Sequence, residues 1–99
     1  MNVRFEWDLD KAARNLAKHH VSFDTAVRAF ADPLALVEQD RIEGGEWRWR
    51  TLGLVEGWLL LLVAHTVWDE DGTEVIRIIS ARRAEPKERK RYENRQDRR

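Results

Sequence analysis

The sequence predicts an α+β domain in which two N-terminal helices pack on a mainly antiparallel four-stranded sheet and a C-terminal helix follows. Apolar residues recur at helical spacing between residues 9 and 17. From residue 46 onward they alternate with polar residues instead, as in a strand with one buried face. The pair Asp71-Gly72, between two β-like stretches, is typical of a hairpin turn. Helices followed by consecutive strands indicate α+β order.

The first third of the chain contains the signals for both N-terminal helices. Residues 3–7 are β-like and are a candidate for one additional strand. Asp8 offers an N-cap to the first helix, which we expect to end near residues 19–20. Ser22 caps a second, shorter helix, and Asp32-Pro33 stops it.

The β signals then run without interruption to residue 81. We expect a first strand that opens with residues 34–37, followed by strands over 46–52, 58–68 and 74–81, with a turn over 53–57. The last two strands are apolar on both faces, which is typical of central strands.

One strand separates its tryptophans from its arginines. Alternation places Trp47 and Trp49 on one face and Arg48 and Arg50 on the other. The two tryptophans lie on what is predicted to be an outer strand, so both cannot easily be fully buried. One of them is therefore expected to help bury a partner or a sister subunit.

The C-terminal segment is predicted to be a basic helix from Pro86 to about residue 95, followed by a frayed tail at 96–99. Tyr92 is almost its only apolar residue. The helix must therefore dock through Tyr92, pair its charges or be ordered by a partner.

Composition narrows the class of protein. We expect one domain over residues 1–99, because this length supports a single core. The absence of Cys excludes disulfides and thiolate metal sites. No stretch resembles a signal peptide, and the longest apolar run, 58–64, is too short for a membrane helix, so a cytoplasmic location without membrane contact is expected.

The net charge of zero conceals an uneven distribution. Residues 82–99 hold nine basic and four acidic side chains, whereas the whole chain holds 18 of each sign. A basic tail on an acidic body can attract nucleic acid or an acidic partner. The alternative is a solvated helix whose charges pair with one another.

The strand at Glu74–Arg83 carries three arginines, Arg77, Arg82 and Arg83. A buried charge costs several kcal/mol unless it is paired. Because Arg binds phosphate and carboxylate groups bidentately, we interpret this strand end as an anion-binding edge.

An ordered series of residues runs through nearly the whole chain: Phe5–Asp8, Lys11, Asn15, Lys18-His19, Val21–Phe23, Ala26, Phe30, Asp32-Pro33, Gly53, Ile76–Ala84, Glu88 and Tyr92-Glu93. This series resembles the BrnT toxins of bacterial type II toxin–antitoxin systems. One departure is His20, where the family usually has a Gly that ends the helix in a left-handed conformation.

The resemblance implies a RelE-like fold and a metal-independent endoribonuclease that inhibits translation. It also implies neutralisation by a BrnA-like antitoxin with a ribbon-helix-helix DNA-binding part, with a 2:2 heterotetramer as one candidate assembly. Operator DNA would then be contacted only through the antitoxin.

RNA cleavage by attack of the 2′-hydroxyl needs proton transfer and cations that stabilise the phosphorane. The candidate catalytic residues are His65, Arg77, Arg82 and Glu46, and the candidate substrate-binding residues are Arg83, Arg48, Ser80, Tyr92 and Lys18, with Arg50 as a possible addition. Adjacent histidines on a helix end cannot both face one ion, so no metal site and no cofactor are expected.

Hairpin register decides which candidates converge. With a two-residue loop, His65 faces Ile78 and should share a face with Ser80 and Arg82. A three-residue loop with a bulge would set His65 opposite Arg77 instead. The sequence leaves both registers open.

Each candidate also has a structural alternative. His65 suits a hydrogen-bonded core histidine, Arg77 suits a partner for Glu6 or Asp8, and the arginines at 82 and 83 suit an antitoxin docking site. The alternative function is a non-catalytic RNA- or antitoxin-binding module that acts as a transcriptional co-repressor.

Overall fold

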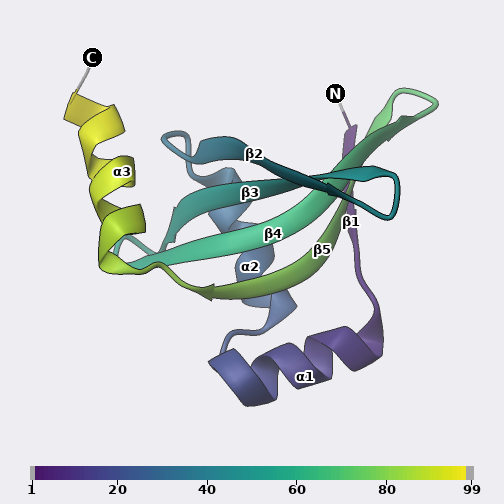
Figure 1. Cartoon of the computed structure of the whole chain (residues 1–99), viewed down its shortest axis with the longest axis horizontal. Helices are drawn as coiled ribbons and strands as arrows, with labels where there is room; N and C mark the ends of the chain where they lie inside the picture. The colour runs from purple at the N-terminus through teal and green to yellow at the C-terminus, as the bar shows by residue number, and fades with distance from the viewer. Residues whose placement is uncertain (1, 98–99) are drawn as a thin grey trace.

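The computed structural model describes residues 2–97 and contains a single five-stranded sheet (Figure 1). The elements are β1 (Asn2–Glu6), α1 (Leu9–His19), α2 (Phe23–Val27), the 3₁₀ helix η1 (Arg28–Ala31), β2 (Leu36–Glu43), β3 (Glu46–Val55), β4 (Leu59–Glu70), β5 (Thr73–Arg83) and α3 (Pro86–Asp97). The strand order is β1-β5-β4-β3-β2, and only the β1–β5 pair among them is parallel. The predicted α+β class is confirmed, with the N-terminal stretch as a fifth strand.

The two faces of the sheet differ in what covers them. One face, called the helix face here, packs against α1, α2 and η1 through a core that includes Phe23, Ala29 and Val63. The other, called the open face, is covered near one end by α3, whose Tyr92 packs on Leu52, Leu60 and Leu62. Figure 1 shows α2 behind the strands, α1 below them and α3 upright at one end.

α3 docks through the residue that the sequence indicated. Tyr92 is 4% exposed, and its hydroxyl donates a hydrogen bond to Asp32 in the turn before β2. The helix begins at Pro86 as predicted and continues to Asp97, two residues beyond its predicted end. Residues 98–99 of the expected frayed tail lie outside the described residues.

The turn predicted at residues 53–57 starts later than expected. β3 continues to Val55, so Gly53 lies inside the strand and the turn covers residues 56–58. A Cβ on Gly53 would lie 2.1 Å from the carbonyl oxygen of Ala29, which is far inside van der Waals contact. Glycine is therefore required here for the close approach of η1 to the sheet, not for a turn.

Both ends of α1 follow the predicted capping signals. The Asp8 side chain accepts a hydrogen bond from the Lys11 N–H, and the chain leaves the helix at His20, whose φ of 61° is left-handed. The His20 N–H donates to the Leu16 carbonyl at 2.9 Å. His20 therefore occupies a position where glycine has no Cβ penalty.

Replacing His20 with glycine is expected to raise the free energy of unfolding by about 1 kcal/mol, because the left-handed strain of a non-glycine residue is removed. Chemical denaturation of the two proteins measures the difference. His19→Gly is the matched control, since His19 has helical geometry and glycine there should destabilise by about 1 kcal/mol. Equal effects of both changes would contradict the account of the cap.

Asn15 is the one buried residue of α1 and joins it to β5. Its Nδ2 donates to the carbonyls of Val21 and Ala81 at 3.0 and 2.8 Å, and its Oδ1 accepts from the Ala81 N–H at 3.1 Å. β1 pairs with β5 only over Thr73–Arg77. The Asn15 amide therefore satisfies backbone groups of β5 beyond the point where β1 ends.

Candidate functional site

The β4–β5 hairpin has the register of a two-residue loop. Glu70 lies opposite Thr73 and His65 lies opposite Ile78, with Asp71-Gly72 between the strands. Both loop residues have positive φ, as this type of tight hairpin requires. One of the two registers left open by the sequence is thereby selected.

A β-bulge then reverses the expected side-chain alternation. The register of β5 shifts by one residue at Ile79, between Ile78 and Ser80. An extra residue moves every later side chain to the other face. Ser80 and Arg82 therefore share the open face with Arg77, which corrects the expectation that they share a face with His65.

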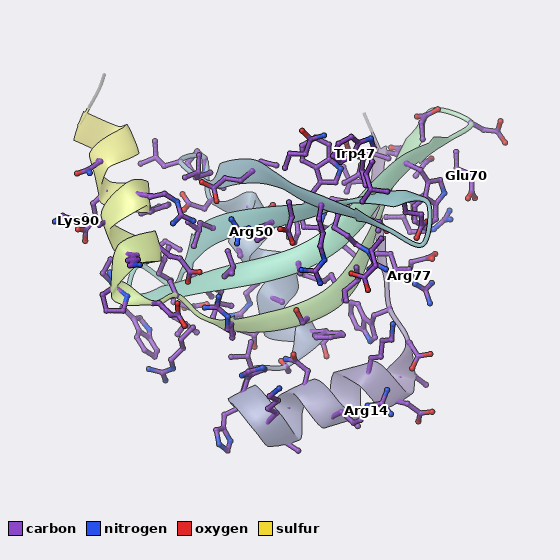
Figure 2. The ribbon with its side chains drawn as sticks, viewed as in Figure 1. Arg14, Trp47, Arg50, Glu70, Arg77 and Lys90 are labelled. Carbon is purple, nitrogen blue, oxygen red and sulfur yellow. The ribbon has the colours of Figure 1, made fainter. Side chains whose placement is uncertain are left out.

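Rows of paired residues cross the open face. From the α3 end they are Leu36–Leu52–Leu62–Arg82, then Glu38–Arg50–Ala64–Ser80, then Thr66–Arg77–Glu6. Arg48 shares this face because it lies two residues from Arg50 in a regular stretch of β3. We name the arginine face as Arg48, Arg50, Arg77 and Arg82 around a floor of Ala64, Thr66 and Ser80. Figure 2 shows Arg50 over the middle of the sheet and Arg77 nearer the N-terminal strand.

Three buried polar atoms of the arginine face have no hydrogen-bond partner among the described residues. They are the Nε atoms of Arg48 and Arg50 and the hydroxyl oxygen of Thr66. A buried donor without a partner costs about 1–3 kcal/mol. The Nδ1 atom of His65, on the helix face, is a fourth such atom. A ligand with acceptor oxygens would complete the hydrogen bonding of Arg48 and Arg50.

The carboxylate of Glu38 holds arginines from two elements together. It accepts two hydrogen bonds from Arg91 of α3 at 3.0 and 2.9 Å, and it lies 3.5 Å from Nη2 of Arg50. Sequence reasoning missed Glu38 and Thr66. A cross-strand pairing of Glu38 with Arg50 was the available signal, but a register shift between Gln39 and Ile42 hides it.

Arg82 is engaged by α3. Its two Nη atoms donate to the two carboxylate oxygens of Glu88, both at 2.8 Å, and Glu88 also accepts from the Glu85 N–H. The hydrogen bonds from Arg82 hold the pKa of Glu88 below its usual value. This bidentate pair fixes the first turn of α3 beside the arginine face.

Arg77 pairs with Glu6, as the structural alternative anticipated. Its Nη1 donates to Glu6 Oε1 at 2.9 Å, and the two side chains are 45% and 34% exposed. Pairs this exposed contribute little to stability. The Arg77 guanidinium is therefore accessible to a ligand.

His65 lies on the helix face, separated from the arginine face by the sheet. It is 2% exposed, its Nε2 lies 2.8 Å from the Thr51 hydroxyl, and its ring meets Phe30 edge-on at 5.0 Å. Burial lowers the pKa of His65 to about 4, so the ring is neutral at neutral pH. This is the environment of a hydrogen-bonded core histidine.

The stability of the protein should therefore fall between pH 6.5 and pH 4. The unfolded chain takes up a proton at His65 near pH 6.5, whereas the folded protein resists it until about pH 4. The full difference corresponds to about 3 kcal/mol of unfolding free energy, present above pH 6.5 and lost toward pH 4. Urea unfolding across this range measures it. His65→Gln, which retains a hydrogen-bonding group, should flatten the profile; an unchanged slope would contradict the assignment.

Three of the remaining predicted site residues lie away from the arginine face, and the fourth, Glu46, lies at its edge. Tyr92 is buried between α3 and the sheet. Arg83 points to the helix face, with its guanidinium 5.9 Å from the centre of the Trp58 ring. Lys18 is in the last turn of α1. Glu46 is exposed at the hairpin end of β3, two residues from Arg48 on the same face and beyond the part of β3 that pairs with β4.

The described part of the chain has neither a cluster of metal-ligating side chains nor a membrane-spanning helix. Residues 2–97 contain no group of three or more His, Cys, Asp or Glu side chains placed to hold a metal ion. No helix within the same residues has the length and apolar character to cross a membrane.

The fold is a small α+β domain that gathers four arginines on one open sheet face. Comparison with family models identifies residues 7–88 as the ribonuclease toxin BrnT of type II toxin–antitoxin systems. The chain therefore belongs to the BrnT family. Membership implies RNA as the substrate and an antitoxin as the partner.

A solved structure supports the fold. The chain is similar to the Brucella abortus ribonuclease toxin BrnT, with a TM-score of 0.56 at 21% sequence identity, over 86% of this chain and 99% of that chain. Comparison with curated protein sequences gives no match. The fold predicted from the family resemblance is confirmed by the structural match.

Proposed function

We propose that this protein is a toxin that cleaves RNA without a metal ion and thereby inhibits translation, with the scissile phosphate bound on the arginine face. The observation that carries this assignment is the set of partnerless buried donors of Arg48, Arg50 and Thr66 on one face. A phosphodiester offers two non-bridging oxygens that accept hydrogen bonds from such donors. Family membership supplies RNA as the source of the phosphate.

The chemistry proposed is attack of the RNA 2′-hydroxyl oxygen on the adjacent phosphorus. The 2′-hydroxyl loses its proton as its oxygen bonds to phosphorus, the bond from phosphorus to the 5′-oxygen breaks, and the 5′-oxygen takes up a proton, which yields a 2′,3′-cyclic phosphate and a 5′-hydroxyl. The phosphorane gains negative charge, and preorganised guanidinium groups in a partly dry site stabilise it more than water does. Arg48 and Arg50 of β3 are assigned to bind the phosphate oxygens. Arg77 of β5 is assigned to stabilise the negative charge of the phosphorane.

The neighbouring residues position these groups. Glu38 links Arg50 to α3, and the Arg82–Glu88 pair fixes the start of that helix. Ser80 lies on the floor opposite Ala64, where its hydroxyl can reach a bound oxygen. His65 is left out of the proposed machinery because it lies on the other face.

The position of His65 also favours a second candidate function. Proton exchange was predicted to involve His65, which is buried on the helix face. The arginine face without it would still bind RNA or an acidic antitoxin segment. The protein would then be a non-catalytic co-repressor that binds DNA through its antitoxin.

Incubation of purified RNA with the isolated protein in EDTA distinguishes the two functions. We expect cleavage products that end in a 2′,3′-cyclic phosphate, because no outside nucleophile takes part. A 2′-O-methylated RNA of the same sequence is the control and should remain intact. Products with a 5′-phosphate, or activity that requires added Mg²⁺, would contradict the mechanism, and binding without cleavage would favour the co-repressor.

The antitoxin is proposed to be a BrnA-like ribbon-helix-helix protein that forms a 2:2 heterotetramer with this chain. Co-expression with the product of the neighbouring gene, followed by light scattering of the purified complex, tests the stoichiometry. A 1:1 mass would contradict it.

A further inference from the structure

Most of the exposed large apolar side chains lie on the helix face, beyond the area that α1, α2 and η1 cover. Val3, Val37, Ile42, Trp47 and Val67 belong to this set, which we call the apolar patch. Trp47 is 49% exposed and Ile42 is 56% exposed. Scattered apolar residues need no explanation, but a group on one face indicates an interaction surface.

The strand pairing makes the patch continuous. Ile76 pairs with Phe5 of β1 and with Val67 of β4, and these three side chains form a row on the helix face. Trp47 pairs with Ile42 of β2. The patch residues therefore come from β1, β2, β3 and β4, with the buried Ile76 of β5 between β1 and β4, and Figure 2 shows Trp47 at the β2–β3 end of the patch.

A hollow beside η1 gives the patch a place for an inserted side chain. Its volume is about 430 Å³, and its walls include Val3, Phe5, Phe30 and Ile76. Glu74 contributes a carboxylate to this hollow and also lines a second one that adjoins Val67. An apolar anchor in such a pocket is typical of the centre of a protein interface.

The charges near the patch define the partner. Asp69, Asp71 and Glu74 lie in or beside the β4–β5 turn, and Asp40 lies beside the β2–β3 turn. None of these four acids has an ion pair within the described residues, whereas Arg28, the basic residue that lines the hollow, is paired with Glu56. A second copy of the chain would place these acids against one another, and RNA would be repelled by them. The complementary partner is an apolar segment with Lys or Arg beside it.

We propose that the apolar patch is the docking surface for an apolar segment of the antitoxin that carries flanking Lys or Arg residues. The inference rests on the proposed toxin function for the identity of the partner. The patch and the arginine face lie on opposite sides of the sheet. Antitoxin docking and RNA cleavage should therefore be separable by mutation.

Titration calorimetry of the full chain with the purified antitoxin encoded beside it tests the proposal. Val67→Asp, which buries a charge in the interface, and Trp47→Ala, which removes an anchor, should each weaken binding by at least about 100-fold. Trp58→Ala is the matched control, because Trp58 is 62% exposed and lies at the β3–β4 turn. This variant should bind within about threefold of wild type.

The role of the acidic side chains near the patch is tested separately. Glu74→Gln combined with Asp69→Asn should weaken binding at low salt and flatten its dependence on salt concentration. An unchanged salt dependence would overturn the assignment of a basic partner segment.

Two other outcomes would overturn the docking proposal. One is wild-type affinity in a folded Val67→Asp protein. The other is a free wild-type dimer that Val67→Asp dissociates in sedimentation, because the patch would then belong to a second copy. RNA cleavage by the same variants should equal that of wild type. If wild type itself cleaves no RNA, the proposed function is lost while the antitoxin titration still decides the docking surface.

Discussion

Arg50→Ala is expected to lower kcat/KM for RNA cleavage by at least about 100-fold while the protein remains folded, since removal of one preorganised donor from a transition-state oxyanion has an effect of this size. The Arg50 Nε atom is buried without a partner among the described residues, and the proposed phosphate would be its acceptor. The fold loses only a 3.5 Å contact with Glu38 when Arg50 is removed. Cleavage of a fluorescent RNA and a thermal melt of each protein measure the two effects.

Two variants make this result specific. Arg50→Lys retains the charge but loses the planar fork, so we expect a smaller loss, of about tenfold. Arg41→Ala removes an exposed arginine of β2 that pairs with Glu43 in solvent, and it should leave cleavage unchanged. Full activity in Arg50→Ala, or an equal loss in Arg41→Ala, would show that cleavage does not depend on the arginine face.

Asn15→Ala should be the most destabilising of the side-chain truncations considered. Three backbone groups, the Val21 carbonyl and both groups of Ala81, lose their partner in a buried position. The expected cost is about 3 kcal/mol, because each buried polar group left unpaired costs about 1–3 kcal/mol and water enters part of the space. Urea unfolding gives the value.

The neighbouring Leu16 provides the comparison for Asn15. It is 50% exposed, so Leu16→Ala should change stability by less than about 1 kcal/mol. Asn15→Asp retains an acceptor for the Ala81 N–H but loses both donors and adds a buried charge, so it should be at least as destabilising as alanine. If Asn15→Ala and Leu16→Ala cost the same, the amide is not what joins α1 to β5.

Features that depend on local chemistry were predictable from the sequence. The N-caps at Asp8 and Ser22 and the helix start at Pro86 all lie where their residue types place them. The separation of Trp49 from Arg50 onto opposite faces of β3 also follows from alternation. In each case the signal lies within a few residues of the feature.

Features that depend on long-range pairing were not predictable. Arg77 and Arg82 are five residues apart, so regular alternation would place them on opposite faces, and only the bulge at Ile79 brings them together. The bulge of β2 hides Glu38 in the same way. Gly53 looked like a turn residue because its requirement comes from Ala29, which is distant in sequence.

His65 illustrates the same limit for the candidate site. Its residue type is suited to proton transfer, but its role depends on which face of β4 it occupies. Its partners are Thr51 of β3 and Phe30 of η1, and no local sequence pattern predicts either contact. The position of His65 on the helix face therefore excludes it from the arginine face, although its residue type suits proton transfer.

The most direct test of the arginine face as the phosphate site is to observe its guanidinium groups by NMR. Nε–Hε resonances of ¹⁵N-labelled protein, assigned by single Arg→Lys variants, would be followed during titration with an uncleavable 2′-O-methyl RNA. We predict that Arg48 and Arg50, whose Nε atoms are buried without partners among the described residues, shift with the bound fraction while Arg41 does not. Saturable RNA binding that leaves the Arg48 and Arg50 resonances unmoved would contradict this account.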